Sequence, residues 1–444
     1  MRLRSQRKIF KRNTILRTII LLTICLFIAQ IRKSPIMRVY NFFLIILFPL
    51  IFFRSLYKSL KFGENPKRIM EKFSIYGGKK SSKPIILIHA VSVGEVLASR
   101  KFVEEIKKRF PDHQTLITCT TQTGSETIKR LYGDSVLHQY MPFDLKFCIK
   151  RFLKNWKPEI TFILETEIWP NLINLLHVQK RKVFLVNGRM SEKSFNRYKL
   201  VMPILDNVFS KLDFTICQGT KDLKRFIELG VNQDRVIKDY SFKFDSLSIQ
   251  NERDNFENKG KKLIICASTH DPEEKILVKA FSMLNHENAI LVLVPRHPER
   301  ASKIIKDIKK LGINPSLFSQ NNLKIDLSNK LNLIDELGYL ESLFSQANIA
   351  FIGGSLIPRG GQNFLEALKF SLPISSGESF YNFQEIAEDL IEMDILKVGN
   401  SAEKLKLIWE EQLNLVPNQI YEKTDNYLKQ RMGASQRAFK HLSL

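Results

Sequence analysis

The chain has 444 residues, which is enough for about two or three domains with sizeable cores. Hydrophobic residues make up 44% and charged residues 26%, proportions typical of globular proteins, so a wholly disordered or fibrous chain is excluded. Lys and Arg total 69 against 45 Asp and Glu, and the net charge of +24 favours an anionic partner such as nucleic acid, phospholipid or a phosphorylated substrate.

The first 60 residues contain two apolar runs, 18–31 and 39–53, set among basic residues. Each run is shorter than the ~20 residues of a relaxed spanning helix, and Pro49 interrupts the second, so a span, a hairpin and an interfacial helix all stay open. No small-residue cleavage site follows Ile31, so we expect an uncleaved anchor. Met37, just before the second run, is an alternative start of translation.

From about residue 84, short β-branched runs alternate with amphipathic stretches, a pattern typical of βαβ units and a parallel sheet. The first group of predicted strands covers residues 84–90, 115–121, 136–141, 159–165, 182–187 and 214–218. Helical patterns lie between them, for example over 94–110 and 146–156. These elements predict one doubly wound α/β domain.

Residues 241–260 are polar with hardly any apolar periodicity, which is the composition of an inter-domain linker. The alternation then restarts. The predicted strands cover residues 262–267, 289–295 and 349–353, and the predicted helices cover 272–284, 298–311, 339–347 and 363–370. The stretch from 386 to the end reads as largely helical.

The pattern therefore predicts an anchor region at 1–60, a first Rossmann-like domain at 61–245 and a second at 246–444. Open parallel sheets bind ligands at the carboxyl ends of their strands, so we expect a ligand in a cleft between the two domains. The residues that follow the predicted strands are accordingly the first candidates for a functional site.

Two predicted strands of the first domain lead into carboxylates. The strand at 84–90 is followed by Glu95, near the start of the next helix, which suits a general base; the alternative is a first-turn Glu that stabilises the helix dipole. The fourth strand ends in Glu165 and Glu167, whose mutual repulsion would raise one pKa and suit acid or electrostatic chemistry. The alternative is that Glu167 caps the helix behind Pro170 and Glu165 merely ends the strand.

The second domain carries groups that suit a nucleotide. Arg296 ends a strand before a helix N-terminus, a good position for a phosphate. The glycine-rich turn at 353–355 permits close backbone approach to an anion, Asn363 could cap the next helix, and Glu366 could accept ribose hydroxyls. This combination is what a nucleotide-sugar donor site needs, whereas a strand-end histidine such as His270 is more often structural than catalytic.

The five cysteines are scattered without a Cys-x-x-Cys spacing, which argues against a zinc site and a disulfide framework. A reducing, cytosol-facing location fits best. No period of 20–50 residues repeats, which argues against a solenoid.

Seven short motifs stand in a fixed order along the chain. They lie at residues 89–95 (HAVSVGE), 123–126 (TGSE), 165–171 (ETEIWPN), 242–245 (FKFD), 267–270 (ASTH), 295–300 (PRHPER) and 351–355 (FIGGS). In this order they resemble the motifs of the Kdo transferases, the 3-deoxy-D-manno-octulosonic acid transferases that glycosylate the lipid A precursor in Gram-negative bacteria. The resemblance covers roughly residue 39 to the end and leaves 1–36 outside.

The resemblance implies a GT-B fold, with two Rossmann-like domains facing a cleft and a single N-terminal membrane anchor in the run 39–53. It implies an inverting glycosyltransferase that moves Kdo from CMP-Kdo to the lipid A precursor (lipid IVA) in lipopolysaccharide biosynthesis, with no metal or other cofactor. The enzyme would lie in the cell inner membrane with its catalytic domains on the cytoplasmic side. Its basic excess would attract the anionic membrane surface.

The resemblance also assigns roles to single residues. Glu95 matches the catalytic base, and Glu165 and Lys243 match residues that stabilise the transition state. Nine further residues match CMP-binding segments, namely Pro295, Arg296, Gly338, Tyr339, Leu340, Asn363, Phe364, Leu365 and Glu366. The chain departs from the family where Tyr339 replaces a usual acidic residue and Gln362 a usual histidine.

Two alternatives come from other classes of protein. Another GT-B glycosyltransferase, using a UDP-sugar on an envelope lipid, would bind UDP in preference to CMP. A non-enzymatic basic membrane or nucleic-acid adaptor would depend on the charge of +24. The chain lacks the interleaved basic and aromatic residues of a nucleic-acid platform, and its strand-end carboxylates would repel a polyanion, so no nucleic-acid partner is expected.

Overall fold

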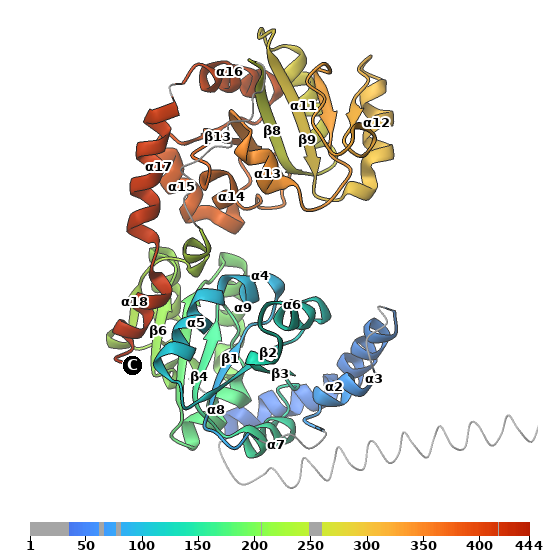
Figure 1. Cartoon of the computed structure of the whole chain (residues 1–444). Helices are drawn as coiled ribbons and strands as arrows, with labels where there is room; N and C mark the ends of the chain where they lie inside the picture. Colours follow the sequence, from blue (N-terminus) through green and yellow to red (C-terminus); the bar gives the residue numbers. More distant parts are fainter. Residues whose placement is uncertain (1–34, 62–65, 77–80, 206, 248–259, 416) are drawn as a thin grey trace, which may run out of the picture. The chain divides into compact units, whose positions relative to one another are not determined.

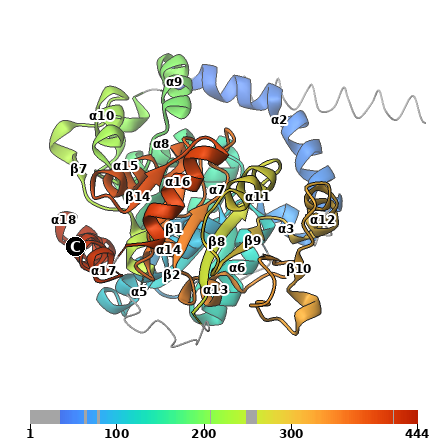
Figure 2. The same ribbon diagram turned by 90° about the horizontal axis from the view of Figure 1, so that it is seen from above.

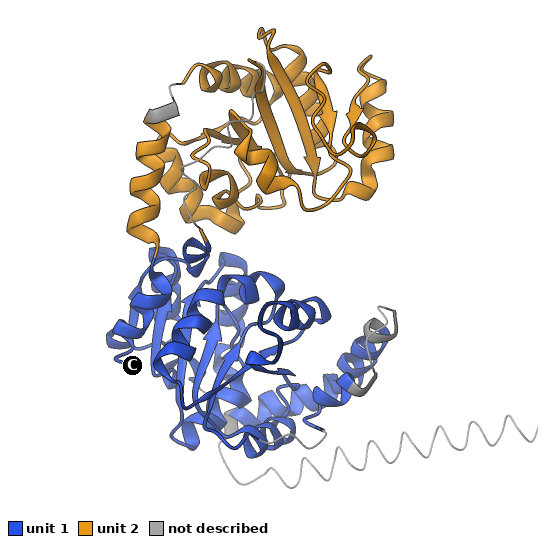
Figure 3. Cartoon of the chain, in the orientation of Figure 1, with its two compact units in different colours: residues 1–246, 433–444 blue, residues 247–432 orange. Residues whose placement is uncertain are grey.

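The computed structural model of the chain describes residues 35–61, 66–76, 81–205, 207–247, 260–415 and 417–444. The predicted apolar run at 18–31 lies outside these residues. The chain divides into two compact units (Figure 3): unit 1 comprises Met1–Ser246 and Gly433–Leu444, and unit 2 comprises Leu247–Met432. Each unit is built on its own seven-stranded parallel sheet.

The sheet of unit 1 has the strand order β3-β2-β1-β4-β5-β6-β7. Its strands are β1 (Ile85–His89), β2 (Gln114–Cys119), β3 (Leu137–Tyr140), β4 (Pro158–Leu164), β5 (Lys182–Gly188), β6 (Phe214–Cys217) and β7 (Val236–Lys238). All five residues of β1 are buried, because helices cover both faces of a parallel sheet. The order reverses between β1 and β4, which is the switch point of a doubly wound sheet.

Helices complete unit 1 on both faces of the sheet (Figure 1). They are α2 (Pro35–Lys61), α3 (Pro66–Glu71), α4 (Val93–Ala98), α5 (Arg100–Arg109), α6 (Gln122–Tyr132), α7 (Lys146–Trp156), α8 (Pro170–Val178), α9 (Glu192–Val201), α10 (Thr220–Glu228) and α18 (Ala434–His441). Shorter 3-10 turns are η1 (Gly133–Ser135), η2 (Met202–Ile204), η3 (Val208–Lys211), η4 (Gln233–Arg235) and η5 (Phe242–Ser246). Alternate residues of β1 enter two different apolar clusters, as the two-residue period of a strand requires.

The predicted helix over 94–110 is two helices, α4 and α5, separated at Ser99. The Ser99 hydroxyl donates to the carbonyl of Val96 at 2.9 Å, a local bond of the kind that competes with the helical ladder. The break leaves α4 as a short helix directly after β1.

The last residues of the chain, 433–444, belong to unit 1 and not to the second domain that was predicted over 246–444. The Asp245 carboxylate accepts hydrogen bonds from the backbone N–H groups of Gly433 (2.6 Å), Ala434 and Ser435, and so caps α18. The ring of Phe439 stacks on that of Phe102 in the core of unit 1 at 4.9 Å. A sequence pattern of helices alone does not show which core the final helix joins.

The sheet of unit 2 has the order β10-β11-β9-β8-β12-β13-β14, which reverses between β8 and β12. Its strands are β8 (Lys262–Thr269), β9 (Ala289–Pro295), β10 (Ser316–Leu317), β11 (Leu331–Leu333), β12 (Ile349–Ile352), β13 (Ile374–Ser376) and β14 (Leu396–Val398). Its helices and 3-10 turns are α11 (Glu273–Ser282), η6 (Pro298–Arg300), α12 (Ala301–Lys309), η7 (Ser319–Asn321), α13 (Leu340–Ser345), α14 (Leu365–Leu368), η8 (Tyr381–Phe383), α15 (Gln384–Glu392), α16 (Ala402–Leu413) and α17 (Pro417–Arg431). Strands of two or three residues are too short to show a periodicity, and β7, β10, β11, β13 and β14 were not predicted.

Helix α2 contains the second predicted apolar run. Within it, Met37–Tyr57 is long and apolar enough to cross a membrane, judged by length and composition. It runs along the outside of unit 1 (Figures 1 and 2).

Candidate active site

Three carboxylates lie beyond the switch point of unit 1. Glu95 follows β1, and Glu165 and Glu167 follow the adjacent strand β4. Lys243, in η5, interacts electrostatically with Glu165 and Glu95. The structure therefore brings together the three residues Glu95, Glu165 and Lys243, at the position where open α/β sheets bind their ligands.

Glu95 lies in the first turn of α4, where Ser92 is the N-cap. The Ser92 hydroxyl donates to Glu95 Oε1 at 2.9 Å, and the backbone N–H of Val91 donates to Oε2 at 2.7 Å. Only 8% of Glu95 is exposed. Burial and then the negative charge of Glu165 raise the pKa of Glu95 to about 7, against these two hydrogen bonds. Glu95 is thus held by a capping interaction and also has a pKa raised towards neutral pH, the range in which a general base is effective.

Glu165 has a left-handed backbone, with φ of 56°, which is uncommon for a residue with a side chain. Asn187, at the end of the neighbouring strand β5, has φ of 54°. The carbonyl oxygen of Val186 accepts from the Glu165 N–H at 3.2 Å. Such conformations persist where the surrounding structure enforces them, and they cluster at functional sites.

Glu167 accepts a hydrogen bond from the indole N–H of Trp169 at 3.1 Å. Burial raises the pKa of Glu167, and the charge of Glu165 raises it further. Glu167 does not cap α8: the Asp144 carboxylate does so, accepting from the backbone N–H groups of Asn171 at 2.9 Å and Leu172 at 3.1 Å. The alternative in which Glu167 is only a helix cap is therefore wrong, and Glu167 belongs to the carboxylate cluster.

Lys243 owes its position to β5. The Asn187 side-chain oxygen accepts from the backbone N–H of Phe242 at 3.0 Å, which fixes η5 beside the end of that strand. Burial lowers the pKa of Lys243, while the charges of Glu165 and Glu95 oppose this change and that of Arg189 adds to it. Two cations and three carboxylates thus share one partly desolvated region.

His89, the last residue of β1, contacts Trp169 beside this cluster. It is fully buried, its Nδ1 lies 3.0 Å from the hydroxyl oxygen of Thr118, and its ring meets the Trp169 ring edge-on at 5.3 Å. Burial lowers the pKa of His89 to about 3, so the imidazole is neutral at physiological pH. His89 therefore adds packing to the site but no positive charge.

In unit 2 the switch point carries a backbone loop built around a buried carboxylate. Glu273, fully buried at the start of α11, accepts from the N–H groups of His270 (2.9 Å) and Gly354 (2.7 Å) on Oε2 and of Ser355 (3.0 Å) and Leu356 (2.9 Å) on Oε1. The N–H groups of the glycine-rich turn, expected to face an anionic ligand, thus bind an anion of the protein itself. A Cβ at Gly353 would lie 2.6 Å from the carbonyl oxygen of Ser268, so only glycine fits there.

Replacing Glu273 with Gln should lower the free energy of unfolding by about 2–5 kcal/mol, because the amide NH₂ would face N–H donors and leave two of them without an acceptor. Equilibrium urea denaturation measures the change. Glu403→Gln is the matched control, since Glu403 is 61% exposed in its ion pair with Lys279 and should matter little. A Glu273 variant within about 0.5 kcal/mol of the wild type would contradict the structural role.

A basic cluster surrounds His270 at the end of β8. Burial, and after it the charges of Arg359, His297, Arg300 and Arg296, lower the pKa of His270 to about 4. Among the described residues, the buried Nε2 of His270 has no hydrogen-bond partner. Arg300 is engaged with Glu274 through two bonds of 3.0 and 3.2 Å. The remaining cations give this edge of the sheet a strongly positive potential.

Arg296 is exposed at the end of β9 and interacts electrostatically with Glu366. Part of the Glu366 side chain is exposed to solvent. Desolvation by the surrounding protein atoms raises the pKa of Glu366, while the hydrogen bond from Asn363 and the positive charge of Arg296 oppose this change. The Asn363 side chain donates to Glu366 Oε1 at 3.1 Å and accepts from the backbone N–H of Leu365 at 3.2 Å. Unit 2 therefore brings Arg296, Asn363 and Glu366 together as the sequence predicted.

The other predicted donor-site residues lie in the same unit. Pro295 and Phe364 are buried, and Gly338 is exposed with φ of 95°. The ring of Tyr339 packs edge-on against a phenylalanine at 5.0 Å, and Leu340 begins α13. Sequence reasoning missed the two organising carboxylates Asp144 and Glu273, since their partners are 27 and 81–83 residues away.

Residues 67–246 match the family model described as 3-deoxy-D-manno-octulosonic-acid transferase. The 3-deoxy-D-manno-octulosonic acid transferase of Haemophilus influenzae is 34% identical over 386 residues, which cover 84% of this chain and 90% of that protein. The enzyme of the same name from Rickettsia bellii is 32% identical, with 83% and 89% covered. A solved glycosyltransferase structure from Rickettsia africae is similar with a TM-score of 0.54 at 13% identity, covering 82% of this chain and 98% of that one, and this confirms the predicted GT-B class of fold.

Proposed function

Since this chain belongs to the family of 3-deoxy-D-manno-octulosonic acid (Kdo) transferases, which are glycosyltransferases, we propose that it moves Kdo from CMP-Kdo to the lipid A precursor, lipid IVA. The observation that carries the proposal is Glu95, a carboxylate beside the switch point of unit 1 whose pKa is raised to about 7. A group that titrates near neutral pH can take a proton from a sugar hydroxyl.

The reaction that we propose inverts the anomeric carbon in one displacement. Glu95 takes the proton of the acceptor hydroxyl as its oxygen attacks the anomeric carbon, and CMP departs with the electron pair of the broken bond. Positive charge develops on the sugar ring, which Glu165 stabilises, and negative charge develops on the phosphate, which Lys243 stabilises. No metal has a step in this scheme.

Unit 2 is the proposed donor unit. Arg296 supplies a positive charge for the phosphate of CMP, and Glu366, oriented by Asn363, accepts hydrogen bonds from ribose hydroxyls. The cluster around His270 adds positive potential for the two anionic groups of a CMP-linked acid sugar.

Arg296→Ala and Glu366→Gln should each weaken CMP binding by about 1–3 kcal/mol, the scale of a lost charge-assisted hydrogen bond. Isothermal titration calorimetry with CMP measures the loss. Lys310→Ala is the control, because that lysine is exposed at the end of α12 and should bind CMP like the wild type. Unchanged affinity in both variants would refute the donor assignment.

The membrane context of the proposal depends on α2, which we take as the anchor at the cytoplasmic face of the inner membrane. The net charge of +24 adds attraction to the anionic membrane surface.

The decisive test is to incubate the purified protein with CMP-Kdo and lipid IVA and to determine the mass and anomeric configuration of the product. Transfer from a UDP-sugar instead of CMP-Kdo would overturn the proposed donor.

A further inference from the structure

Helix α2 is bonded to the rest of unit 1 by polar contacts, which a helix that served only as a membrane tether would not need. The Tyr40 hydroxyl donates to Asp144 Oδ2 at 2.9 Å. The side-chain amides of Asn41 and Asn171 bond to each other in both directions, at 3.2 and 2.9 Å, and Asn41 is 4% exposed. Asn171 lies in the first turn of α8, and Asp144, which precedes α7, caps that turn. These bonds therefore join α2 to the start of α8, directly after the β4–α8 turn that carries the carboxylates.

The same face of α2 continues the contact with aromatic rings. Phe48 packs edge-on against Phe73 at 5.7 Å and Phe143 at 6.1 Å, and Phe52 packs against Phe73 at 5.6 Å. From Tyr40 to Phe52 the helix thus lies against the rest of unit 1 over about 18 Å, at 1.5 Å per residue. A helix that crossed the bilayer would have to leave the unit and break these contacts.

The opposite face of α2 exposes large apolar side chains. They are Phe42, Phe43, Ile46, Leu47, Leu50, Phe53 and Tyr57, each between 41% and 69% exposed. Arg54 is exposed near the end of this face. A helix with one face on protein and the other face apolar fits the plane of the membrane surface, with the apolar face in the boundary between headgroups and acyl chains.

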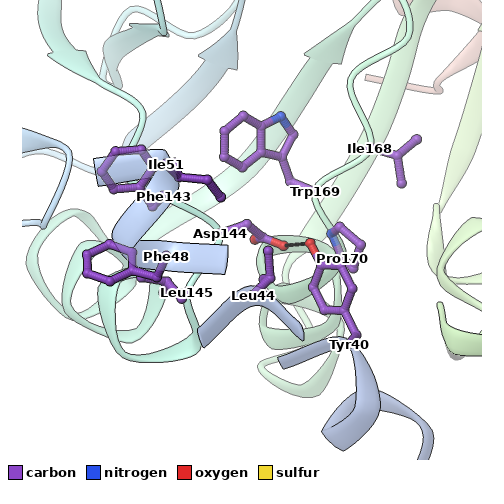
Figure 4. A pocket seen from close by; sticks show the side chains of 10 residues that line it. All are labelled: Tyr40, Leu44, Phe48, Ile51, Phe143, Asp144, Leu145, Ile168, Trp169 and Pro170. Carbon is purple, nitrogen blue, oxygen red and sulfur yellow. Dashed lines mark hydrogen bonds between the residues drawn. The ribbon is translucent and has the colours of Figure 1, made fainter. Parts of the chain in front are cut away.

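A pocket of about 240 Å³ lies behind α2 (Figure 4). It is lined by Tyr40, Leu44, Phe48, Ile51, Phe143, Asp144, Leu145, Ile168, Trp169 and Pro170. The only ionisable carboxylate in the lining, Asp144, already accepts from Tyr40, Asn171 and Leu172. The volume is below the ~300–1,000 Å³ of pockets that enclose whole ligands, so it suits one section of an apolar chain.

Trp169 is a wall that the pocket shares with the carboxylate cluster. Its indole N–H donates to Glu167 and its ring contacts His89. Leu44, Phe48 and Ile51 form another wall and belong to the helix whose outer face is apolar. The pocket thus lies between the carboxylate cluster and a helix with an apolar outer face, a position that suits a molecule with both a polar part and an apolar chain.

We propose that this pocket holds a section of one hydrocarbon chain of the lipid acceptor, delivered by α2 lying in the plane of the membrane surface. The inference rests on the proposed function for the identity of the acceptor. It explains why α2 is bonded to the β4–α8 turn: the helix that meets the lipid is fixed to the loop that carries Glu165 and Glu167.

The test compares an acceptor with full-length chains and an analogue with chains shortened to four carbons, both in detergent micelles. Leu44→Phe and Ile51→Trp fill the pocket, and Leu50→Trp is the matched control on the outer face, where Leu50 is 69% exposed. Each buried methylene contributes about fourfold in affinity, so losing two should raise KM for the full-length acceptor about 15-fold. KM for the short-chain analogue and for the donor should stay within about twofold.

A second measurement uses a diazirine at the end of an acceptor chain, with mass spectrometry of the labelled peptide. Labelling of the segment 44–51 that falls in the pocket-filling variants supports the proposal. An equal rise in KM for both acceptors, a rise in the control, or stronger labelling by a diazirine phospholipid that the acceptor does not displace would overturn it. Absence of transfer by the wild type would contradict the proposed function, while the labelling still tests the pocket.

Discussion

Glu95→Gln is expected to reduce kcat by about 10²–10⁴-fold, the usual contribution of a general base, with CMP affinity within a few-fold of the wild type. The amide keeps the shape of the side chain and can still accept from the N–H of Val91. What it loses is the ability to take a proton from the acceptor hydroxyl. Steady-state transfer from CMP-Kdo and calorimetry with CMP measure the two effects separately.

The pH dependence gives this prediction a second readout. Because the pKa of Glu95 is raised to about 7, the base is ionised above that pH and protonated below it. The rate of the wild type should therefore fall as pH is lowered through about 7, and the residual activity of Glu95→Gln should lack this acid limb.

The folded state should tolerate the change. The folded pKa of Glu95 lies above the value of an exposed Glu, so burying the ionised form costs stability as pH rises from about 4.5 to about 7. At pH 8 the free energy of unfolding of Glu95→Gln should therefore be at least as large as that of the wild type. Gly94→Ala is a useful neighbour control, because Gly94 is exposed and a Cβ there would meet nothing nearer than 3.9 Å. Near-normal turnover of Glu95→Gln would defeat the assignment of the base.

The main strands and the positions of several site residues can be predicted from local sequence patterns. The β-branched runs predict the six longest strands of unit 1 and the three longest of unit 2, and strand ends predict where Glu95, Glu165 and Arg296 stand. Glu95 shows that the two interpretations of a first-turn carboxylate are compatible, since it is held by Ser92 and also has a raised pKa.

What the sequence does not show is side chains that organise distant backbone. Asp144 caps a helix 27 residues later, and Glu273 binds a loop more than 80 residues later. Such pairings are set by the topology of the sheet, which brings sequence-distant strand ends together, and no local spacing encodes them. The sequence also does not show which face of α2 packs on the protein. The helix is apolar on all sides, so its two faces differ only through the contacts of one of them with the rest of unit 1.

The second large effect is expected at Lys243. Its charge stands among Glu165, Glu95 and Arg189, where burial lowers its pKa. Replacement by Met keeps the length and apolar stem of the side chain and removes the charge. If Lys243 stabilises the negative charge of the departing phosphate, kcat should fall by about 10²–10³-fold, as for other lost electrostatic partners of a transition state.

The measurements must separate this role from a structural one. Removing the half-buried charge relieves its desolvation but leaves Glu165 and Glu95 less compensated, so the free energy of unfolding is measured beside kcat. A merely structural lysine would change the free energy of unfolding without changing the pH dependence of the rate. Loss of a nearby positive charge should also raise the pKa of Glu95, so the acid limb of the residual rate should move to higher pH. Lys238→Met, at an exposed position of β7 in the same unit, should show none of these changes. If Lys243→Met retains more than a tenth of wild-type kcat with an unmoved acid limb, then the charge of Lys243 has no part in the transition state.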